Sequence, residues 1–156
     1  MRNPNGAIDT LKRLMSELPD DPLAVEAQAR IAGVQLYSLR DFGAARAALR
    51  DFMAGHPDYP AMMVVACDLA YCSYDQADYA GAAALFTEAG KLEEVGNYRA
   101  MILYMTADCY MRILDFKKAK EQADLLISTY PNEPAAALAV EMYASLTGSW
   151  MTGGAQ

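Results

Sequence analysis

The sequence predicts an all-α fold, a solenoid of antiparallel helical hairpins with about eight helices. One motif (Asp, aromatic residue, two variable residues, Ala) opens at Asp41, Asp78 and Asp115, at a constant interval of 37 residues. Proline pairs recur in the strings PDDP, PDYP and PNEP, and the segments between these marks consist mostly of helix-forming residues. A fixed period of this size is typical of stacked-repeat architectures.

The composition indicates one globular domain and argues against several classes of partner. The 156 residues are 54% hydrophobic and 21% charged, and the net charge of −7 argues against nucleic-acid binding. No window approaches the roughly 18 apolar residues of a membrane span. Cys67, Cys72 and Cys109 lie in apolar runs, which favours buried thiols in a reducing compartment. Because the first residues form no apolar signal segment, we expect a cytoplasmic protein, or a periplasmic one if a leader was removed.

The first elements are a half repeat over residues 6–19 and a full hairpin over residues 22–57. The half repeat matches the second helix of a hairpin, with Ala7 at the motif's Ala position. Pro22 suits the first turn of the hairpin's first helix, and Gly55 with Pro57 ends its second helix. The turn between the two helices is only about two or three residues long, so they must run antiparallel. Asp41 at this turn is a natural N-cap for the second helix.

The later elements repeat this plan. Hairpins are expected over residues 60–94 and 97–131, with Glu94 replacing the closing proline of the second, and a last helix over residues 134–148 ends at Gly148. The tail, residues 149–156, is expected to be flexible. Small residues on the two helices of each hairpin predict close packing: Gly33, Ala70, Ala107 and Ala144 on first helices, with Ala45, Ala82 and Ala119 on second helices. The apolar last helix would be covered by the tail with Trp150, by another chain, or by the rest of a longer protein.

This pattern resembles the tetratricopeptide repeat (TPR) family over nearly the whole chain. The small residues and closing prolines fall at the family's positions, as do Tyr110 and Phe86. No Trp opens a first helix, and the period exceeds the family's roughly 34 residues, which predicts a longer connection or an added turn after Pro57. The resemblance implies a right-handed superhelical solenoid whose first helices line a concave, ligand-binding face.

The resemblance also implies which residues line that face. They are Arg30, Val34, Tyr37, Val64, Cys67, Tyr71, Tyr74, Asp75, Met101, Tyr104, Met105, Asp108, Met111, Arg112, Leu138, Glu141 and Met142. Family members that clamp a C-terminal carboxylate carry Lys and Asn at these places, so that mode is not expected here. Tyr and Met favour an apolar or amphipathic peptide segment of another protein, oriented by the charged residues. The competing interpretation is that the same stripe packs as core between repeats.

The sequence contains no constellation of catalytic residues. His56 is the only histidine and lies in a helix-ending loop, where it forms neither a metal site nor a nucleophile–base pair. No glycine-rich phosphate loop is present, and we expect no cofactor or metal. The sequence therefore predicts a non-catalytic protein–protein interaction module, an adaptor or a small chaperone. The alternatives are a self-assembling scaffold (a homo-oligomer joined through its terminal helices) and a periplasmic envelope-assembly scaffold.

Overall fold

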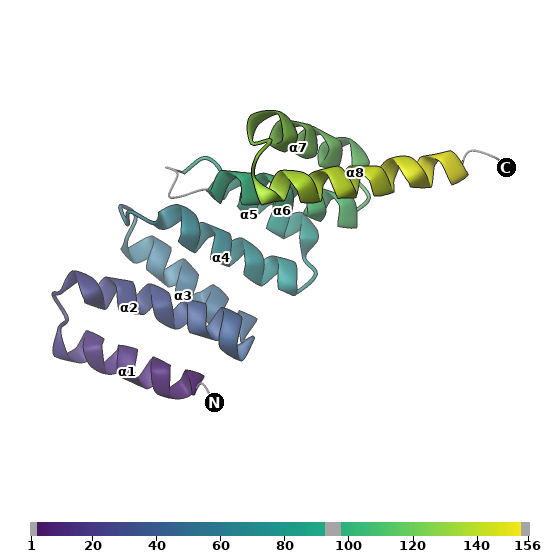
Figure 1. Ribbon diagram of the computed structural model, residues 1–156. Coiled ribbons are helices and arrows are strands. Elements are labelled where there is room, and N and C mark those ends of the chain that lie inside the picture. The colour runs from purple at the N-terminus through teal and green to yellow at the C-terminus, as the bar shows by residue number, and fades with distance from the viewer. Residues whose placement is uncertain (1–2, 93–97, 154–156) are drawn as a thin grey trace.

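The computed structural model describes residues 3–92 and 98–153; in the last helix, side chains are described as far as Met142 and at Ala144. Eight helices make up the described part of the chain, with a π-helical segment, η1, extending the second (Figure 1). They are α1 (Pro4–Glu17), α2 (Pro22–Gly33), η1 (Val34–Leu39), α3 (Phe42–Gly55), α4 (Met62–Asp75), α5 (Tyr79–Ala89), α6 (Tyr98–Arg112), α7 (Phe116–Thr129) and α8 (Pro134–Gly153). The predicted all-α solenoid is confirmed.

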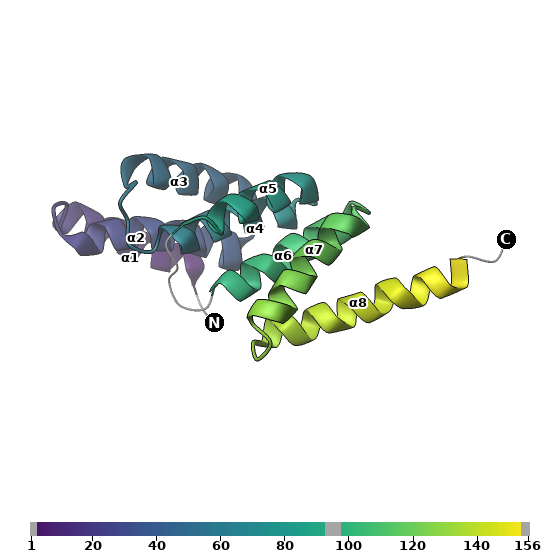
Figure 2. The ribbon, with the colours of Figure 1, turned by 90° about the horizontal axis from the view of Figure 1, so that it is seen from above.

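The helices stack as successive hairpins in two layers. Helices α2, α4, α6 and α8, which we call the first-helix layer, alternate along the chain with α3, α5 and α7, and α3 and α5 lie behind α2 and α4 (Figures 1 and 2). Each helix packs on its neighbours in sequence, and within the first-helix layer α4 also packs on α6, and α6 on α8. Helix α1 packs on α2 and on η1.

The recurring Asp motif closes each hairpin in the same way. A side-chain oxygen of Asp41, Asp78 and Asp115 accepts a hydrogen bond from the backbone N–H three residues later, at 3.0, 3.0 and 3.2 Å. Each Asp is therefore an N-cap, as predicted. The preceding residues are Arg40, Ala77 and Leu114, which adopt left-handed backbone conformations with φ of 57°, 61° and 61°. This backbone reversal turns the chain sharply enough for the second helix to return along the first.

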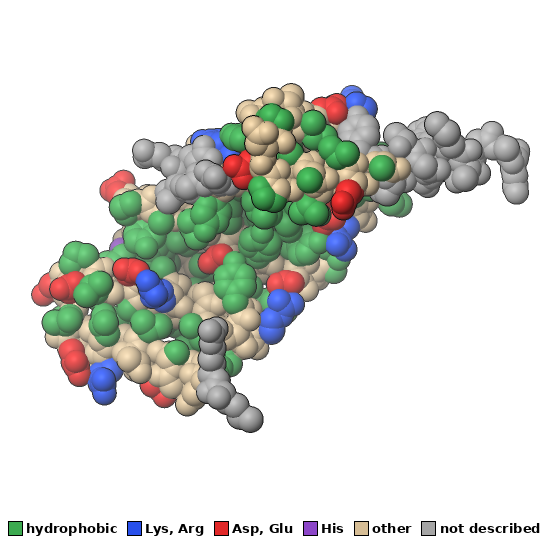
Figure 3. Space-filling view, in the orientation of Figure 1, with side chains coloured by type: hydrophobic (Ala, Val, Ile, Leu, Met, Phe, Trp, Pro, Cys, Tyr) green, Lys and Arg blue, Asp and Glu red, His purple; other side chains and the backbone are tan. Residues whose placement is uncertain are grey.

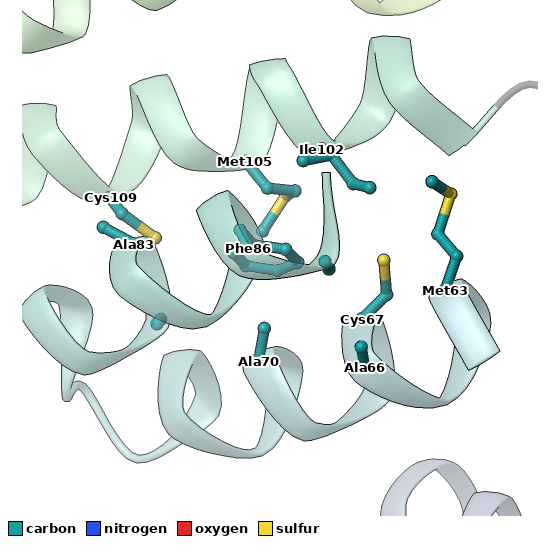
Figure 4. Packing of buried hydrophobic residues seen from close by; sticks show 11 residues of the cluster. Met63, Ala66, Cys67, Ala70, Ala83, Phe86, Ile102, Met105 and Cys109 are labelled. Carbon is teal, nitrogen blue, oxygen red and sulfur yellow. The ribbon is translucent and has the colours of Figure 1, made fainter. Parts of the chain in front are cut away.

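The core lies between the two layers, and small residues allow the helices to approach. Ala70, Ala82 and Ala107 are fully buried, as are the other motif alanines, Ala45 and Ala119. The largest cluster joins α4, α5 and α6 around Phe86, which points toward Met105 (Figure 4). Overpacking at these alanines would therefore separate the helices.

The prediction for Gly33 was wrong. A Cβ at this position would meet open space, and it is Ala32 that is fully buried. The cause is η1, because a π-helical turn contains an extra residue and shifts the register of everything before it. Ala32 lies 38 residues before Ala70 and takes the equivalent place. Ala144 is also exposed, so it does not supply the small packing surface expected of it.

The remaining boundaries agree with the predictions in part. The connection between α3 and α4 spans residues 56–61, which is the longer connection expected after Pro57. Helix α8 does not end at Gly148 but continues to Gly153, so the tail was placed too early. The turn around Glu94, the side chain of Trp150 and residues 154–156 lie outside what is described. None of the described helices combines the length and apolar character needed to cross a membrane.

Candidate functional site

A cavity of about 750 Å³ opens between α1, α2 and α4. Its lining is Ala7, Thr10, Leu11, Glu26, Ala29, Arg30, Gly33, Val34, Ser38, Leu49, Tyr59, Ala61, Val64, Val65 and Asp68. Most of these side chains are apolar, and the few polar ones come from all three helices. Figure 3 shows the face of the molecule formed by the first-helix layer, where hydrophobic side chains gather across the middle.

The cavity exists because the first-helix layer is not evenly packed. Helix α4 packs on α6, and α6 on α8, whereas α2 and α4 make little direct contact. Gly33 places no side chain in the space, and the following residue, Val34, starts the π-helix. π-Helical segments occur often at functional sites, where they redirect neighbouring side chains. The local sequence therefore leaves space here that other repeats fill with core side chains.

Two polar pairs lie at this cavity. Arg30 and Glu26, one turn apart on α2, form an exposed ion pair at 2.6 Å. Asp68 on α4 accepts a hydrogen bond of 2.5 Å from the Tyr37 hydroxyl on η1. Burial raises the pKa of Asp68, and the Tyr37 hydrogen bond opposes this by favouring the ionised carboxylate. Burial and the same hydrogen bond both raise the pKa of Tyr37.

One repeat further on, a related cluster spans α4 and α6. The Tyr74 hydroxyl donates to Asp108 at 2.6 Å, and Arg112 Nε donates to the same carboxylate oxygen at 2.7 Å. The Arg112 guanidinium lies 5.0 Å from the ring centroids of both Tyr74 and Tyr79. These are cation–π contacts. The cluster therefore links two repeats, and its two charged groups, Asp108 and Arg112, pair with each other.

Comparison with known proteins agrees with this architecture. A tetratricopeptide repeat family model matches residues 102–133, which span most of α6, all of α7 and the turn before α8. Residues 102–133 are therefore similar to a tetratricopeptide repeat. No curated protein matches the sequence.

Solved structures extend the likeness to most of the chain. Two crystal structures of the nearly identical TPR-like repeats of a putative kinesin light chain from Podosopora anserina align with TM-scores of 0.68 and 13% sequence identity. Both alignments cover 87% of this chain, and they cover 73% and 74% of the kinesin light chain repeats. At this identity the likeness shows a TPR-like fold alone.

The predicted groove residues are divided by the structure into three groups. Arg30, Val34 and Val64 line the cavity of the TPR-like array. A second group lies exposed or half-buried elsewhere on the first-helix layer: Tyr37, Tyr71, Tyr74, Asp75, Met101, Tyr104, Asp108, Met111, Arg112, Leu138, Glu141 and Met142. The third group is Cys67 and Met105, which are buried in the core.

Cys67 and Met105 therefore do not belong to an accessible groove. They are 2% and 8% exposed and pack in the cluster between α4, α5 and α6 (Figure 4). The cause is helix contact, since α4 and α6 pack on each other and on α5, and both side chains lie between these helices. Burial raises the pKa of the Cys67 thiol to about 12. These two residues therefore pack as core between repeats, which was the competing interpretation of the sequence.

Sequence reasoning missed Asp68 and the contribution of α1. Asp68 is four residues after Val64, so both lie on one face of the helix, and this spacing could have identified it. The participation of Ala7, Thr10 and Leu11 could not be anticipated, because it depends on how far α2 and α4 separate. His56 lies at the end of α3, where its Nε2 is 3.1 Å from Gln28 Oε1 and its ring contacts Phe52.

Proposed function

We propose that this TPR-like protein is a non-catalytic interaction module that holds an apolar or amphipathic segment of another protein in the cavity between α1, α2 and α4. The observation that carries the proposal is the cavity itself, which combines an apolar lining with polar side chains at Arg30, Glu26 and Asp68. Recognition sites of this kind obtain affinity from apolar contact and orientation from a few polar groups. The module would act as an adaptor or as a small chaperone that shields its partner's apolar segment.

The size of the cavity supports a segment of a protein rather than a single side chain. Its volume of about 750 Å³ is within the range of sites that enclose several side chains at once. Val34 on η1 and Val64 on α4 supply branched apolar surface to the lining. Gly33 lets a ligand approach the backbone of α2 closely, because no side chain intervenes.

A pair of glycine substitutions tests this proposal. Both Gly33 and Gly55 have open space where a Cβ would stand, but only Gly33 lines the cavity. Peptides selected from a displayed random library on the immobilised full chain provide the probe. We expect Gly33→Leu to weaken binding of a selected peptide by about tenfold or more, since the added side chain takes up cavity space beside the backbone of α2, while Gly55→Leu binds like the wild type.

The control for this experiment is the fold. Both variants should keep the helical circular dichroism and a cooperative unfolding transition, because neither added side chain meets a neighbour at its Cβ. If Gly33→Leu is folded and binds every selected peptide as well as the wild type does, the cavity is not the binding site and the proposal is wrong.

A second candidate function is self-association. Leu138 and Val140 on α8 are 42% and 52% exposed, which leaves apolar side chains uncovered on two sides of that helix. A second copy could cover them and build a scaffold. Molar mass measured by light scattering over a range of concentrations tests this idea, and a strictly monomeric species would remove it.

The three cysteines also suggest where the module works. Cys67, Cys72 and Cys109 are all buried as free thiols. Buried, unpaired thiols suit a reducing compartment, so we propose the cytoplasm.

A further inference from the structure

Asp68 differs from the other aspartates of the first-helix layer in having no cationic partner among the described residues. Asp108 pairs with Arg112 at 2.7 Å, and Asp75 pairs with Arg40 at 3.1 Å. Asp68 accepts only the Tyr37 hydroxyl hydrogen bond among the described residues. The sequence explains the difference between Asp68 and Asp108. The residue four positions after Asp108 is Arg112, whereas the residue four positions after Asp68 is the buried Cys72.

The cavity therefore holds an uncompensated negative charge. Its other charged side chains, Glu26 and Arg30, neutralise each other in an ion pair. A partly buried carboxylate without a cation is costly, because neither water nor an opposite charge fully replaces its hydration. A ligand with a positive charge could pair with Asp68 in the way that Arg112 pairs with Asp108, and this ion pair would strengthen its binding.

We infer that the segment bound in this cavity carries a lysine or arginine side chain that pairs with Asp68, flanked by apolar residues. The inference rests on the proposed function and adds the chemistry of the partner. Asp68 Oδ1 remains bonded to Tyr37, and the other carboxylate oxygen receives the partner's cation. The charge of −7 on the whole chain steers such a basic segment toward the protein.

Peptides are first selected on the wild-type chain. The experiment then compares their affinity for the wild type with their affinity for Asp68→Asn. This variant keeps the shape of the side chain and an acceptor for Tyr37 but removes the charge. We expect the selected peptides to share a Lys or Arg among apolar residues and to bind Asp68→Asn about tenfold more weakly. Replacing that Lys or Arg by Met in the peptide should weaken wild-type binding equally and leave binding to Asp68→Asn unchanged.

A matched control is Asp75→Asn, which removes a carboxylate that already pairs with Arg40 outside the cavity lining. It should bind the selected peptides like the wild type. Suppose that Gly33→Leu weakens peptide binding, but that the peptides bind Asp68→Asn at full affinity or contain no basic residue. The cavity then binds a segment without this ion pair, and the inference is wrong. If Gly33→Leu blocks no peptide, the proposed function and the inference both fail.

Discussion

Tyr74 on α4 donates a hydrogen bond of 2.6 Å to Asp108 on α6, and so ties one hairpin to the next. Tyr37 lies 37 residues earlier and makes the same kind of bond to Asp68. We expect Tyr74→Phe to lower the free energy of unfolding by about 1–2 kcal/mol, since it removes a hydrogen bond to a charged group. Urea unfolding provides the measurement. Tyr71→Phe is the control, because its hydroxyl makes no hydrogen bond with the described residues; equal losses in both variants would contradict the role of the bond.

Ala77 adopts a left-handed conformation with φ of 61°, which is unfavourable for a residue with a Cβ. Ala77→Gly should therefore stabilise the protein by about 1 kcal/mol and raise its melting temperature by about 2–4 °C. Ala80→Gly, in an exposed position within α5, should instead destabilise it by about 0.5–1 kcal/mol. Thermal unfolding of both variants checks the pair. A destabilised Ala77→Gly would show that the turn is built differently.

Gly33 lies in a helical conformation, and a Cβ there would meet open space. Gly33→Ala should stabilise the protein by about 0.5–1 kcal/mol, because alanine loses less backbone entropy on folding. The interpretation from sequence, in which Gly33 permits close helix packing, predicts the opposite sign. Chemical denaturation of this variant decides between the two, and a loss of stability would contradict the structure around η1.

Asp68 gives the stability a defined pH dependence. Its pKa is raised by burial in the folded state, so the folded protein holds this proton more tightly than the unfolded chain does. Its contribution is favourable at low pH and is lost as the pH rises from the unfolded pKa through the folded one. The stability of Asp68→Asn relative to the wild type should therefore increase between pH 3 and neutral pH. Unfolding free energies at several pH values test this, and a relative stability that falls with pH would contradict it.

Ala82 is fully buried where α5 meets α4 and α6. Ala82→Leu should lower the free energy of unfolding by about 1–3 kcal/mol, because the added methyl groups force the helices apart. Ala84→Leu, on the exposed side of the same helix, should have little effect. If both substitutions are silent in denaturant unfolding, the pairing of the hairpins described above is incorrect.

Much of the fold could be predicted because the repeat marks report local chemistry. An Asp before a helix caps it wherever it occurs, and alanines at a constant interval indicate close packing without reference to the rest of the chain. The register of α2 was harder to predict. The interval between Pro19 and Pro57 is 38 residues, one more than the 37 between the Asp motifs, and this difference was a sign of an inserted residue. The end of α8 was misplaced because Gly148, a common helix terminator, is tolerated inside a helix here.

The candidate site was harder to predict than the fold. A stripe of residues on one helix face does not show which neighbour covers it. Cys67 and Met105 became core because α4 packs on α6, whereas Val34 and Val64 line a cavity because α2 and α4 separate. These outcomes depend on distances between helices, which arise from the packing of the whole layer. Tyr and Met were expected to form the ligand surface, yet the cavity is lined chiefly by smaller apolar side chains.

Methyl NMR during titration with a selected peptide tests the central claim most directly. Val34, Val64 and Val65 line the cavity and report on its occupation, while Leu126 lies fully buried in the distant cluster of α6, α7 and α8. Binding between α1, α2 and α4 predicts large shift changes at the three valines and none at Leu126. Shift changes confined to the methyl groups of α6, α7 and α8, with the valines unaffected, would contradict the account.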